Sequence, residues 1–279
     1  MRASASAPGT PIFLENSACC EDHFFHGKVH SSFHRIGIVK TLSIHSQFAD
    51  VWAFHDCFIK KTISTVPASQ RLNAEKYAWL IGFYEADGWV STLKCGKYIL
   101  YELGIGLHVR DMPLLYQINN EFQLSGSVNV RKDKPDIVYL QIRKKKVLIE
   151  KIVPIFDNFP MLGQKKQNYD WFRFHLIENK TIYHADLANF KFPLTAYVAP
   201  SVNQLLMKPY YDYWLIGFIN GEGCFSTYLQ KNKYMVCSFS VSQTVSGDLL
   251  LSTIRTRLKL GPQVYLHKET GNFKLKVTS

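Results

Sequence analysis

Two stretches of the chain carry the same nearly all-apolar pattern. They are Trp79-Leu-Ile-Gly-Phe-Tyr-Glu-Ala-Asp-Gly-Trp89 and Trp214-Leu-Ile-Gly-Phe-Ile-Asn-Gly-Glu-Gly-Cys224, and each carries an acid just before its last glycine. Apolar residues on most sides of a helical turn are typical of a helix that is buried on most faces. We therefore expect a helix over 77–86 that ends at its acid, and an equivalent helix in the second stretch.

Between these stretches, the pattern alternates with the period of two that is typical of strands. Turn signals at Cys95-Gly96, Ser125-Gly126 and 133–136 separate the elements. The order expected after the first helix is strands at 90–95 and 97–108, a helix at 111–123, strands at 127–132 and 137–143, and helices from 145 onward. This order predicts an α+β unit with a four-stranded antiparallel sheet.

The pattern recurs on the scale of a whole domain. Trp79 and Trp214 lie 135 positions apart, and the same offset places Leu140 on Leu275. A duplicated fold is the simplest explanation. The expected organisation is a poorly ordered extension at 1–72, a first half at 73–180, a linker at 181–210 and a second half at 211–279.

The second half reaches Ser279 before it can repeat the segment that follows the fourth strand of the first half. We therefore expect the second half to lack its terminal helices and a counterpart of Lys165. Without those helices, the apolar face that carries Phe273, Leu275 and Val277 would be exposed.

Each predicted sheet has one apolar face and one polar, basic face. Val138 and Leu140 alternate with Tyr139 and Gln141, and the last strand alternates in the same way. Side chains of Arg, Lys, Gln and Asn can read base edges in the major groove of DNA. The alternative is the ordinary solvated face of an antiparallel sheet. The candidate DNA contacts are Lys94, Lys97, Arg110, Arg131, Lys132, Gln141, Arg143, Lys231, Lys233, Gln243, Lys268, Lys274 and Lys276.

Charge is consistent with a polyanionic partner. The chain has 33 Lys and Arg against 22 Asp and Glu, which gives a formal net charge of +11. Such a field attracts nucleic acid, although it is equally compatible with nonspecific binding. The first 70 residues contain no uninterrupted apolar run long enough to span a bilayer, and no membrane partner is expected.

Glycines in the two predicted helices suggest how these helices pack. Gly82 and Gly217 carry no side chain and would allow two backbones to approach closely. Gly88 and Gly223, which follow the acids, fit the left-handed position that often ends a helix. The two helices are therefore expected to pack against each other.

That packing would bring Asp87 and Glu222 together at helix C-termini, where the helix dipole disfavours a carboxylate by roughly 0.3–1 kcal/mol. A compensating cation is expected, and converging carboxylates suit Mg²⁺, which also takes water and phosphate oxygens. The alternative is that these acids are solvated helix ends. The occurrence of the acid in both copies favours the metal site.

At these residues, the sequence resembles single-chain LAGLIDADG homing endonucleases. Leu80–Gly88 and Leu215–Gly223 are similar to the two signature helices of that family, and the resemblance covers about residues 75–279. The most similar group is encoded in group I introns of fungal mitochondrial genes, notably the cytochrome b intron maturase/endonucleases. Lys97–Ile105 and Lys274–Ser279 support this closer match.

The resemblance implies that Asp87 and Glu222 bind Mg²⁺ or Mn²⁺ across the scissile phosphates, with contributions from the carbonyls of Ala86 and Gly221. Lys165 matches a basic residue that lines the catalytic pocket in the family, although Lys166 could occupy that register instead. Asn220 departs from the acid usual at its position, which is similar to one that packs or caps in the family.

The implied function is site-specific cleavage of double-stranded DNA in intron homing, by a mitochondrial protein that acts as a monomer. One alternative is an RNA maturase that binds its own group I intron and assists splicing. Another is a truncated relic that has lost activity.

Overall fold

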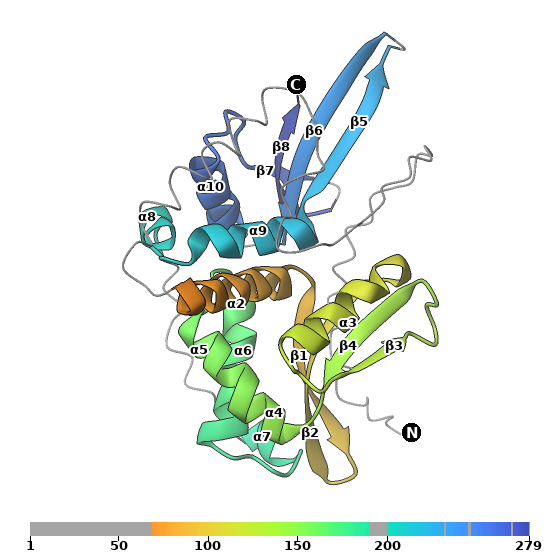
Figure 1. Ribbon diagram of the computed structural model, residues 1–279, viewed down its shortest axis with the longest axis vertical. Coiled ribbons are helices and arrows are strands. Elements are labelled where there is room, and N and C mark those ends of the chain that lie inside the picture. Colours follow the sequence, from red (N-terminus) through yellow and green to blue (C-terminus); the bar gives the residue numbers. More distant parts are fainter. Residues whose placement is uncertain (1–67, 190–199, 232, 245–246, 269, 279) are drawn as a thin grey trace, which may run out of the picture. The chain divides into compact units, whose positions relative to one another are not determined.

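The computed structural model describes the chain except for residues 1–67, 190–199, 232, 245–246, 269 and 279 (Figure 1). The expected poorly ordered extension therefore lies mostly outside the described residues. The first half begins with a helix and a sheet: α2 (Ala68–Asp87), β1 (Gly88–Cys95), β2 (Tyr98–His108), η1 (Val109–Asp111), α3 (Met112–Glu121), β3 (Ser127–Val130) and β4 (Ile137–Ile142). A helical segment follows: α4 (Lys145–Val147), η2 (Leu148–Ile152), α5 (Val153–Asn158), α6 (Lys165–Arg173) and η3 (Phe174–Glu178).

Helix α2 starts nine residues before the expected position of Tyr77, so residues 68–72 belong to the helix and not to an extension. Ala68, Gln70, Arg71 and Leu72 favour helix without an apolar period. The apolar pattern alone therefore marked the buried part of α2 and missed its first turns.

The first sheet is four-stranded and antiparallel, in the order β1-β2-β4-β3. Cross-strand pairs such as Leu103↔Ile142 and Ile105↔Leu140 set its register. These four side chains are at most 2% exposed, and they lie on the face that the helices cover. The expected α+β half with a four-stranded antiparallel sheet is confirmed.

The second half repeats this plan. Its elements are α9 (Tyr211–Glu222), β5 (Cys224–Gln230), β6 (Tyr234–Gln243), α10 (Asp248–Arg257), β7 (Tyr265–His267) and β8 (Asn272–Thr278). The strand order, β5-β6-β8-β7, is the order of the first sheet. The repeat in the sequence is therefore a repeat of the fold.

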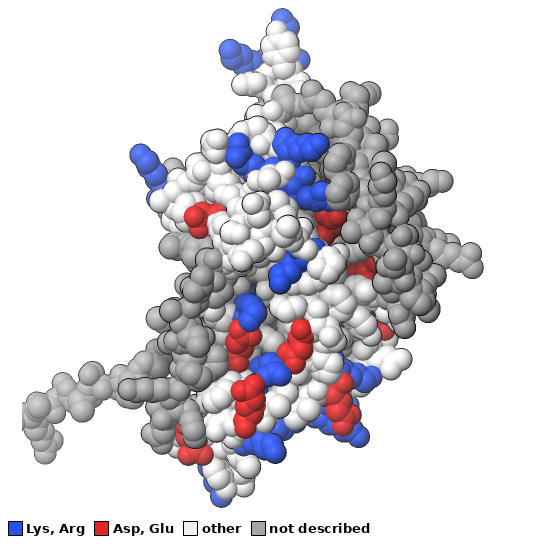
Figure 2. All heavy atoms as spheres, turned by 90° about the vertical axis from the view of Figure 1, so that its left-hand side faces the viewer, with Lys and Arg blue, Asp and Glu red and all other residues white. Residues whose placement is uncertain are grey.

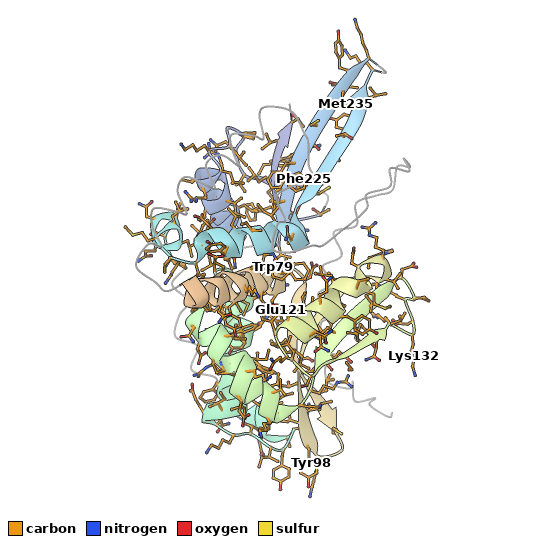
Figure 3. The ribbon with its side chains drawn as sticks, in the orientation of Figure 1. Trp79, Tyr98, Glu121, Lys132, Phe225 and Met235 are labelled. Atoms are coloured by element: carbon orange, nitrogen blue, oxygen red, sulfur yellow. The ribbon has the colours of Figure 1, made fainter. Side chains whose placement is uncertain are left out.

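The expected exposure of the second apolar face is only partly correct. Leu275 is fully buried and Phe273 packs against the core, beside α10, which contacts β8 and β6. The exposed apolar residues of that face lie further out on the β5–β6 hairpin, where Phe225 and Leu229 are each 59% exposed and Met235 is 67% exposed. Figure 3 shows Phe225 near the base of the hairpin and Met235 towards its far end.

The segment expected to be a linker is partly structured. It contains the short helices α7 (Asp186–Asn189) and α8 (Val202–Leu206). Helix α8 begins with a reciprocal capping box between Ser201 and Gln204, and its buried Leu205 belongs to the core. The start of the segment pairs with β2, as described below.

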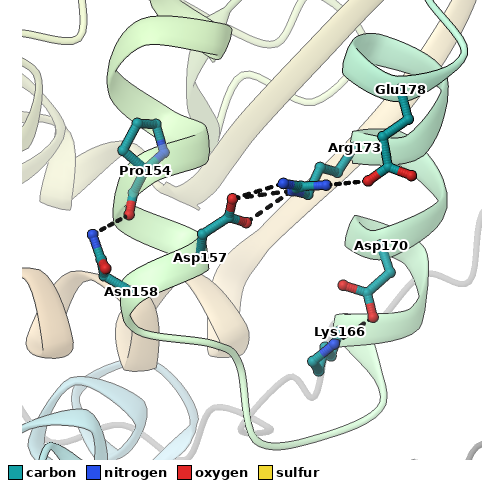
Figure 4. A network of polar contacts seen from close by, with 7 residues as sticks. All are labelled: Pro154, Asp157, Asn158, Lys166, Asp170, Arg173 and Glu178. Carbon is teal, nitrogen blue, oxygen red and sulfur yellow. Dashed lines mark hydrogen bonds and ion pairs between the residues drawn. The ribbon is translucent and has the colours of Figure 1, made fainter.

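Ion pairs hold α6 against α5 in the first half (Figure 4). Arg173 donates to both carboxylate oxygens of Asp157 at 2.9–3.1 Å and also contacts Glu178, while Lys166 contacts Asp170 one turn along α6. These contacts fix the helix that begins at Lys165.

Acidic and basic side chains also lie side by side over the lower part of the face shown in Figure 2. A face of mixed sign attracts a polyanion only weakly. None of the helices in the described part of the chain is long and apolar enough to cross a membrane.

Candidate functional site

The site begins with the packing of α2 against α9. A Cβ atom added at Gly82 would collide with the carbonyl of Trp214, and one added at Gly217 would collide with the carbonyl of Trp79. The two glycines are thus reciprocal points of backbone contact, which side chains would hold apart. The structure therefore brings the two signature helices together at these glycines.

The helix ends differ from the expectation. Gly223 has φ −77° and ψ 127°, and neither it nor Gly88 is among the described residues with positive φ. The chain passes directly from helix into strand, without a left-handed residue. Space explains the glycines instead, because a Cβ at Gly88 would meet the ring of Tyr84 and one at Gly223 would meet the carbonyl of Ile219.

Asp87 and Glu222 are the last residues of α2 and α9. A Cβ added at Gly221 would lie 2.6 Å from Oδ2 of Asp87, so this carboxylate reaches over the backbone of the other helix. Burial raises the pKa of Asp87 to about 6. Burial, with repulsion from Asp87, raises the pKa of Glu222 to about 7. Both acids therefore lie in an environment that disfavours their charge unless a cation is near.

Lys165 supplies one cation at this point. Its Nζ donates to the carbonyl oxygens of Ala86 at 2.6 Å and Gly88 at 3.0 Å. Burial lowers its pKa, against the attraction of Glu222, Asp87 and Glu85. Lys166 instead pairs with Asp170, so the structure places Lys165, and not Lys166, beside the two acids.

Glu85 is a residue of this site that the sequence did not single out. It is 3% exposed, and its carboxylate accepts from the backbone N–H groups of Leu162, at 2.9 Å, and Gly163. It also accepts from Nε1 of Trp214 at 2.8 Å. Glu85 thus ties the loop before Lys165 to both signature helices. An acid inside an otherwise apolar stretch of helix was the available signal in the sequence. Its hydrogen-bond donors, however, lie far from it along the chain.

The donor set suits a divalent metal that also binds phosphate. The described residues contain no group of three or more His, Cys, Asp or Glu side chains that could hold a metal ion. A pair of buried carboxylates fits Mg²⁺ or Mn²⁺, which need only one or two carboxylates when phosphate oxygens and water complete the shell. The Ala86 carbonyl already accepts from Lys165, which leaves one lone pair for such a role.

The face of each sheet opposite the buried side chains is called here the open face. On the first sheet it carries Trp89, Glu102, Tyr139 and Gln141, by the alternation of the paired strands. The ring of Trp89 lies over Gly104, where an added Cβ would collide with it. This face therefore combines aromatic and polar groups.

Several candidate DNA contacts lie on the open faces or the adjoining turns. Arg143 lies on the first open face and pairs with Glu102 at 2.6 Å, while Arg131 pairs with Asp133 at 2.9 Å. Lys274 and Lys276 lie on the second open face, opposite Ser242 and Ser240. Turn or loop positions hold Lys97, Lys132, Lys231, Lys233 and Lys268, and Arg110 lies in η1.

Two of the candidate DNA contacts do not lie on the open faces. Strand alternation puts Lys94 on the side of Val90 and Leu103, and Gln243 on the side of Val241 and Phe273. Gln243 hydrogen-bonds Glu222 there. Both residues thus belong to the helix-covered sides, contrary to the expectation, because strand parity and not residue type decides the face.

Fold and site together define a class: a pseudo-symmetric protein of two α+β halves, with one acidic site where two signature helices end. The chain belongs to the LAGLIDADG endonuclease family, whose model matches residues 80–175 and 215–279. This confirms the expected family.

The curated relatives include a mitochondrial protein and a probable intron-encoded endonuclease. The chain is 30% identical over 184 residues to the uncharacterized mitochondrial protein RF1 of Saccharomyces cerevisiae, covering 64% of this chain and 38% of that protein. It is 26% identical over 226 residues to the probable intron-encoded endonuclease Cox1-I1b of Schizosaccharomyces pombe, covering 72% of this chain and 55% of that one. The chain thus spans about a third to a half of the length of these relatives.

Solved structures share the fold. The LAGLIDADG homing endonuclease I-GzeII in complex with its DNA target aligns with a TM-score of 0.55 at 21% identity, covering 73% of this chain and 78% of that chain. I-SmaMI, bound to uncleaved DNA target in the presence of calcium ions, aligns with a TM-score of 0.56 at 20% identity, covering 73% and 79%.

Proposed function

We propose that the protein is a site-specific, metal-dependent endonuclease of double-stranded DNA. The observation that carries this proposal is the meeting of Asp87, Glu222 and Lys165 at the ends of two packed helices. Phosphodiester hydrolysis needs an activated water and neutralisation of charge at the phosphate, and a bound divalent metal supplies both.

In this proposal, Asp87 and Glu222 hold Mg²⁺ or Mn²⁺ beside the scissile phosphates. Lys165 is held by the carbonyls of Ala86 and Gly88, so its ammonium group lies where it can stabilise negative charge. Glu85 holds the loop that precedes Lys165. The open faces bind the duplex, with Gln141 and the lysines of β8 directed towards it.

The biological setting follows from the relatives. One is named as a mitochondrial protein and another as a probable intron-encoded endonuclease. We therefore infer that this protein acts in a mitochondrion, in the homing of an intron.

The test is cleavage of a plasmid library that carries randomised inserts, read by sequencing the cut ends. We expect the protein to cut a defined set of inserts with Mg²⁺ and to leave them intact with EDTA. Asp87→Asn should reduce the rate of cutting more than about a hundredfold. Loss of a residue that only hydrogen-bonds a metal ligand typically reduces activity about 10- to 100-fold, and loss of a ligand should cost more. Equal cutting by Asp87→Asn, or no cutting by the unmodified protein, would contradict the proposal.

A further inference from the structure

The first residues of the linker extend the first sheet. The N–H of Ile99 donates to the carbonyl of Ile182 at 2.9 Å, and the N–H of His184 donates to the carbonyl of Lys97 at 3.0 Å. Between these bonds, Tyr98 and Tyr183 form an antiparallel bridge. Strand β4 pairs with β2 only from Leu103 onward, so the segment takes the edge of β2 that β4 leaves towards the hairpin.

This added segment is anchored to the core of the first half. The N–H of Thr181 donates to the carbonyl of His175 at 2.9 Å, and Nδ2 of Asn179 donates to Oγ1 of Thr181 at 2.7 Å. The hydroxyl of Tyr101, on β2, lies 3.1 Å from the carbonyl of Thr181. Buried contacts therefore hold the chain at Thr181, two residues before Tyr183.

Strand alternation shows which face the tyrosine pair occupies. Tyr101 is buried against Phe172 of α6, with ring centroids 5.5 Å apart. Tyr98 lies three positions earlier on β2, so it points to the opposite, open face. Tyr183 stacks on it, with ring centroids 5.7 Å apart and an angle of 24° between the rings. The linker thus contributes a side chain to the open face.

The two tyrosines remain accessible, and the positive charge of Lys97 lies over both rings. Tyr98 is 49% exposed and Tyr183 is 45% exposed, and Nζ of Lys97 lies 5.3 Å and 5.7 Å from the two ring centroids. Figure 3 shows Tyr98 at the far end of the β1–β2 hairpin. We call Lys97, Tyr98 and Tyr183 the tip cluster.

We propose that the tip cluster binds the phosphate backbone of duplex DNA that flanks the cleavage site. This inference rests on the proposed function and adds an outer contact to it. The tip cluster continues the open face, its charge complements phosphate, and tyrosine hydroxyls donate readily to phosphate oxygens. The alternative is that the tyrosine pair only stabilises the hairpin, in which case its hydroxyls would not affect the affinity for DNA.

The length of β2 determines how far from the cleavage site the tip cluster would contact the duplex. Ile105 pairs with Gly88, next to Asp87, and lies seven residues from Tyr98. At about 3.3 Å per residue this is roughly 23 Å, or about seven base pairs at about 3.4 Å each. A duplex that extends only about five base pairs from the cleavage site on this side would therefore miss the tip cluster.

The experiment measures binding of the whole protein to a duplex recovered from the cleavage selection, under Ca²⁺. One probe extends 15 base pairs on both sides of the cleavage site, and two others are shortened to five base pairs on one side or the other. The Tyr98→Phe/Tyr183→Phe double variant keeps both rings and removes only the hydroxyls. Tyr116→Phe is the control, because Tyr116 is similarly exposed, at 48%, but lies on α3.

We expect the double variant to bind the long duplex three- to tenfold more weakly and to bind one shortened duplex as the unmodified protein does. Lys97→Ala should lower the slope of log K against log salt by about 0.9, the value for one phosphate contact, and again only where the flank is present. Lys208→Ala, at an exposed lysine beside α8, should bind as the unmodified protein does.

An equal loss on long and shortened duplexes, or no loss on any, would overturn the tip cluster as a flank contact. Failure of the unmodified protein to bind any duplex would overturn the proposed function itself, so the two failures are distinguishable.

Discussion

Burial gives Asp87 and Glu222 properties that solvated carboxylates do not have. Their pKa values, about 6 and about 7, are raised chiefly by burial. Lys165 offsets part of this effect in both cases. One buried lysine between two buried acids leaves a net negative site, which a divalent metal would neutralise.

These pKa shifts predict how the stability of the metal-free protein depends on pH. Because both pKa values are raised, the folded state binds more protons than the unfolded state between about pH 4 and pH 7. The free energy of unfolding attributed to these groups therefore falls as pH rises through that range. We expect the Asp87→Asn/Glu222→Gln double variant to show a smaller fall in urea titrations in EDTA from pH 5 to pH 8. Parallel curves for the two proteins would contradict this.

Glu85→Gln should weaken both the fold and the positioning of Lys165. An amide oxygen cannot replace a carboxylate that accepts from Leu162, Gly163 and Trp214, so a buried donor would lose its partner, at a cost of about 1–3 kcal/mol. We expect lower stability in urea and a kcat reduced about 10- to 100-fold, with little change in duplex affinity. Loss of affinity with unchanged kcat would show that Glu85 does not position Lys165.

The sequence singled out the residues of the site that lie inside the repeated motifs. Asp87 and Glu222 were evident because each closes a repeated helix pattern. The donors to Glu85 and the stacking of Tyr183 on Tyr98 depend on residues far apart in the chain. Local patterns do not contain such contacts, so residue type alone left these roles undetected.

Among the elements, α2 and α9 depend on backbone contact at Gly82 and Gly217. A methyl group at Gly217 would collide with the carbonyl of Trp79 and lie 2.8 Å from the N atom of Phe83. We therefore expect Gly217→Ala to destabilise the protein by at least about 1–3 kcal/mol, measured by urea unfolding. Gly261→Ala is the control, because an added Cβ there meets no atom within 4 Å. Equal effects of the two changes would contradict the packing described.

The β5–β6 hairpin carries exposed apolar side chains, and at one of these positions the matching hairpin of the first half has a lysine. The repeat aligns Leu229, which is 59% exposed, with Lys94. We expect Leu229→Lys to leave the melting temperature nearly unchanged and to reduce self-association at high concentration, because exposed apolar patches promote association. Light scattering would measure this, and unchanged scattering would contradict it.

The elements were largely predictable, since the strands and helices of the first half, apart from the start of α2, lie within a few residues of the expected positions. Three features were not. The first turns of α2 lack an apolar period, the glycines after the acids serve close packing and not a left-handed turn, and α10 covers Leu275. The first reflects local helix propensity, and the other two are decided by tertiary contacts.

At the scale of the whole molecule, duplication provides the two signature helices and their packing provides one shared site. The halves are not equivalent there. Glu85 of α2 bridges to the loop before Lys165, whereas the residue aligned with it in α9 is Asn220. Glu222 receives a hydrogen bond from Gln243 of its own half. A single site with unequal contributions from two halves should therefore depend on both.

The central claim is that Asp87 and Glu222 act as one unit in a single metal-dependent cleavage site. The measurement that tests it most directly compares cleavage of a selected plasmid with Mg²⁺ by the unmodified protein, Asp87→Asn, Glu222→Gln and the double variant. Groups that act together show non-additive losses, so each single variant should lose nearly as much activity as the double variant. A double loss equal to the product of two modest single losses would contradict the shared site.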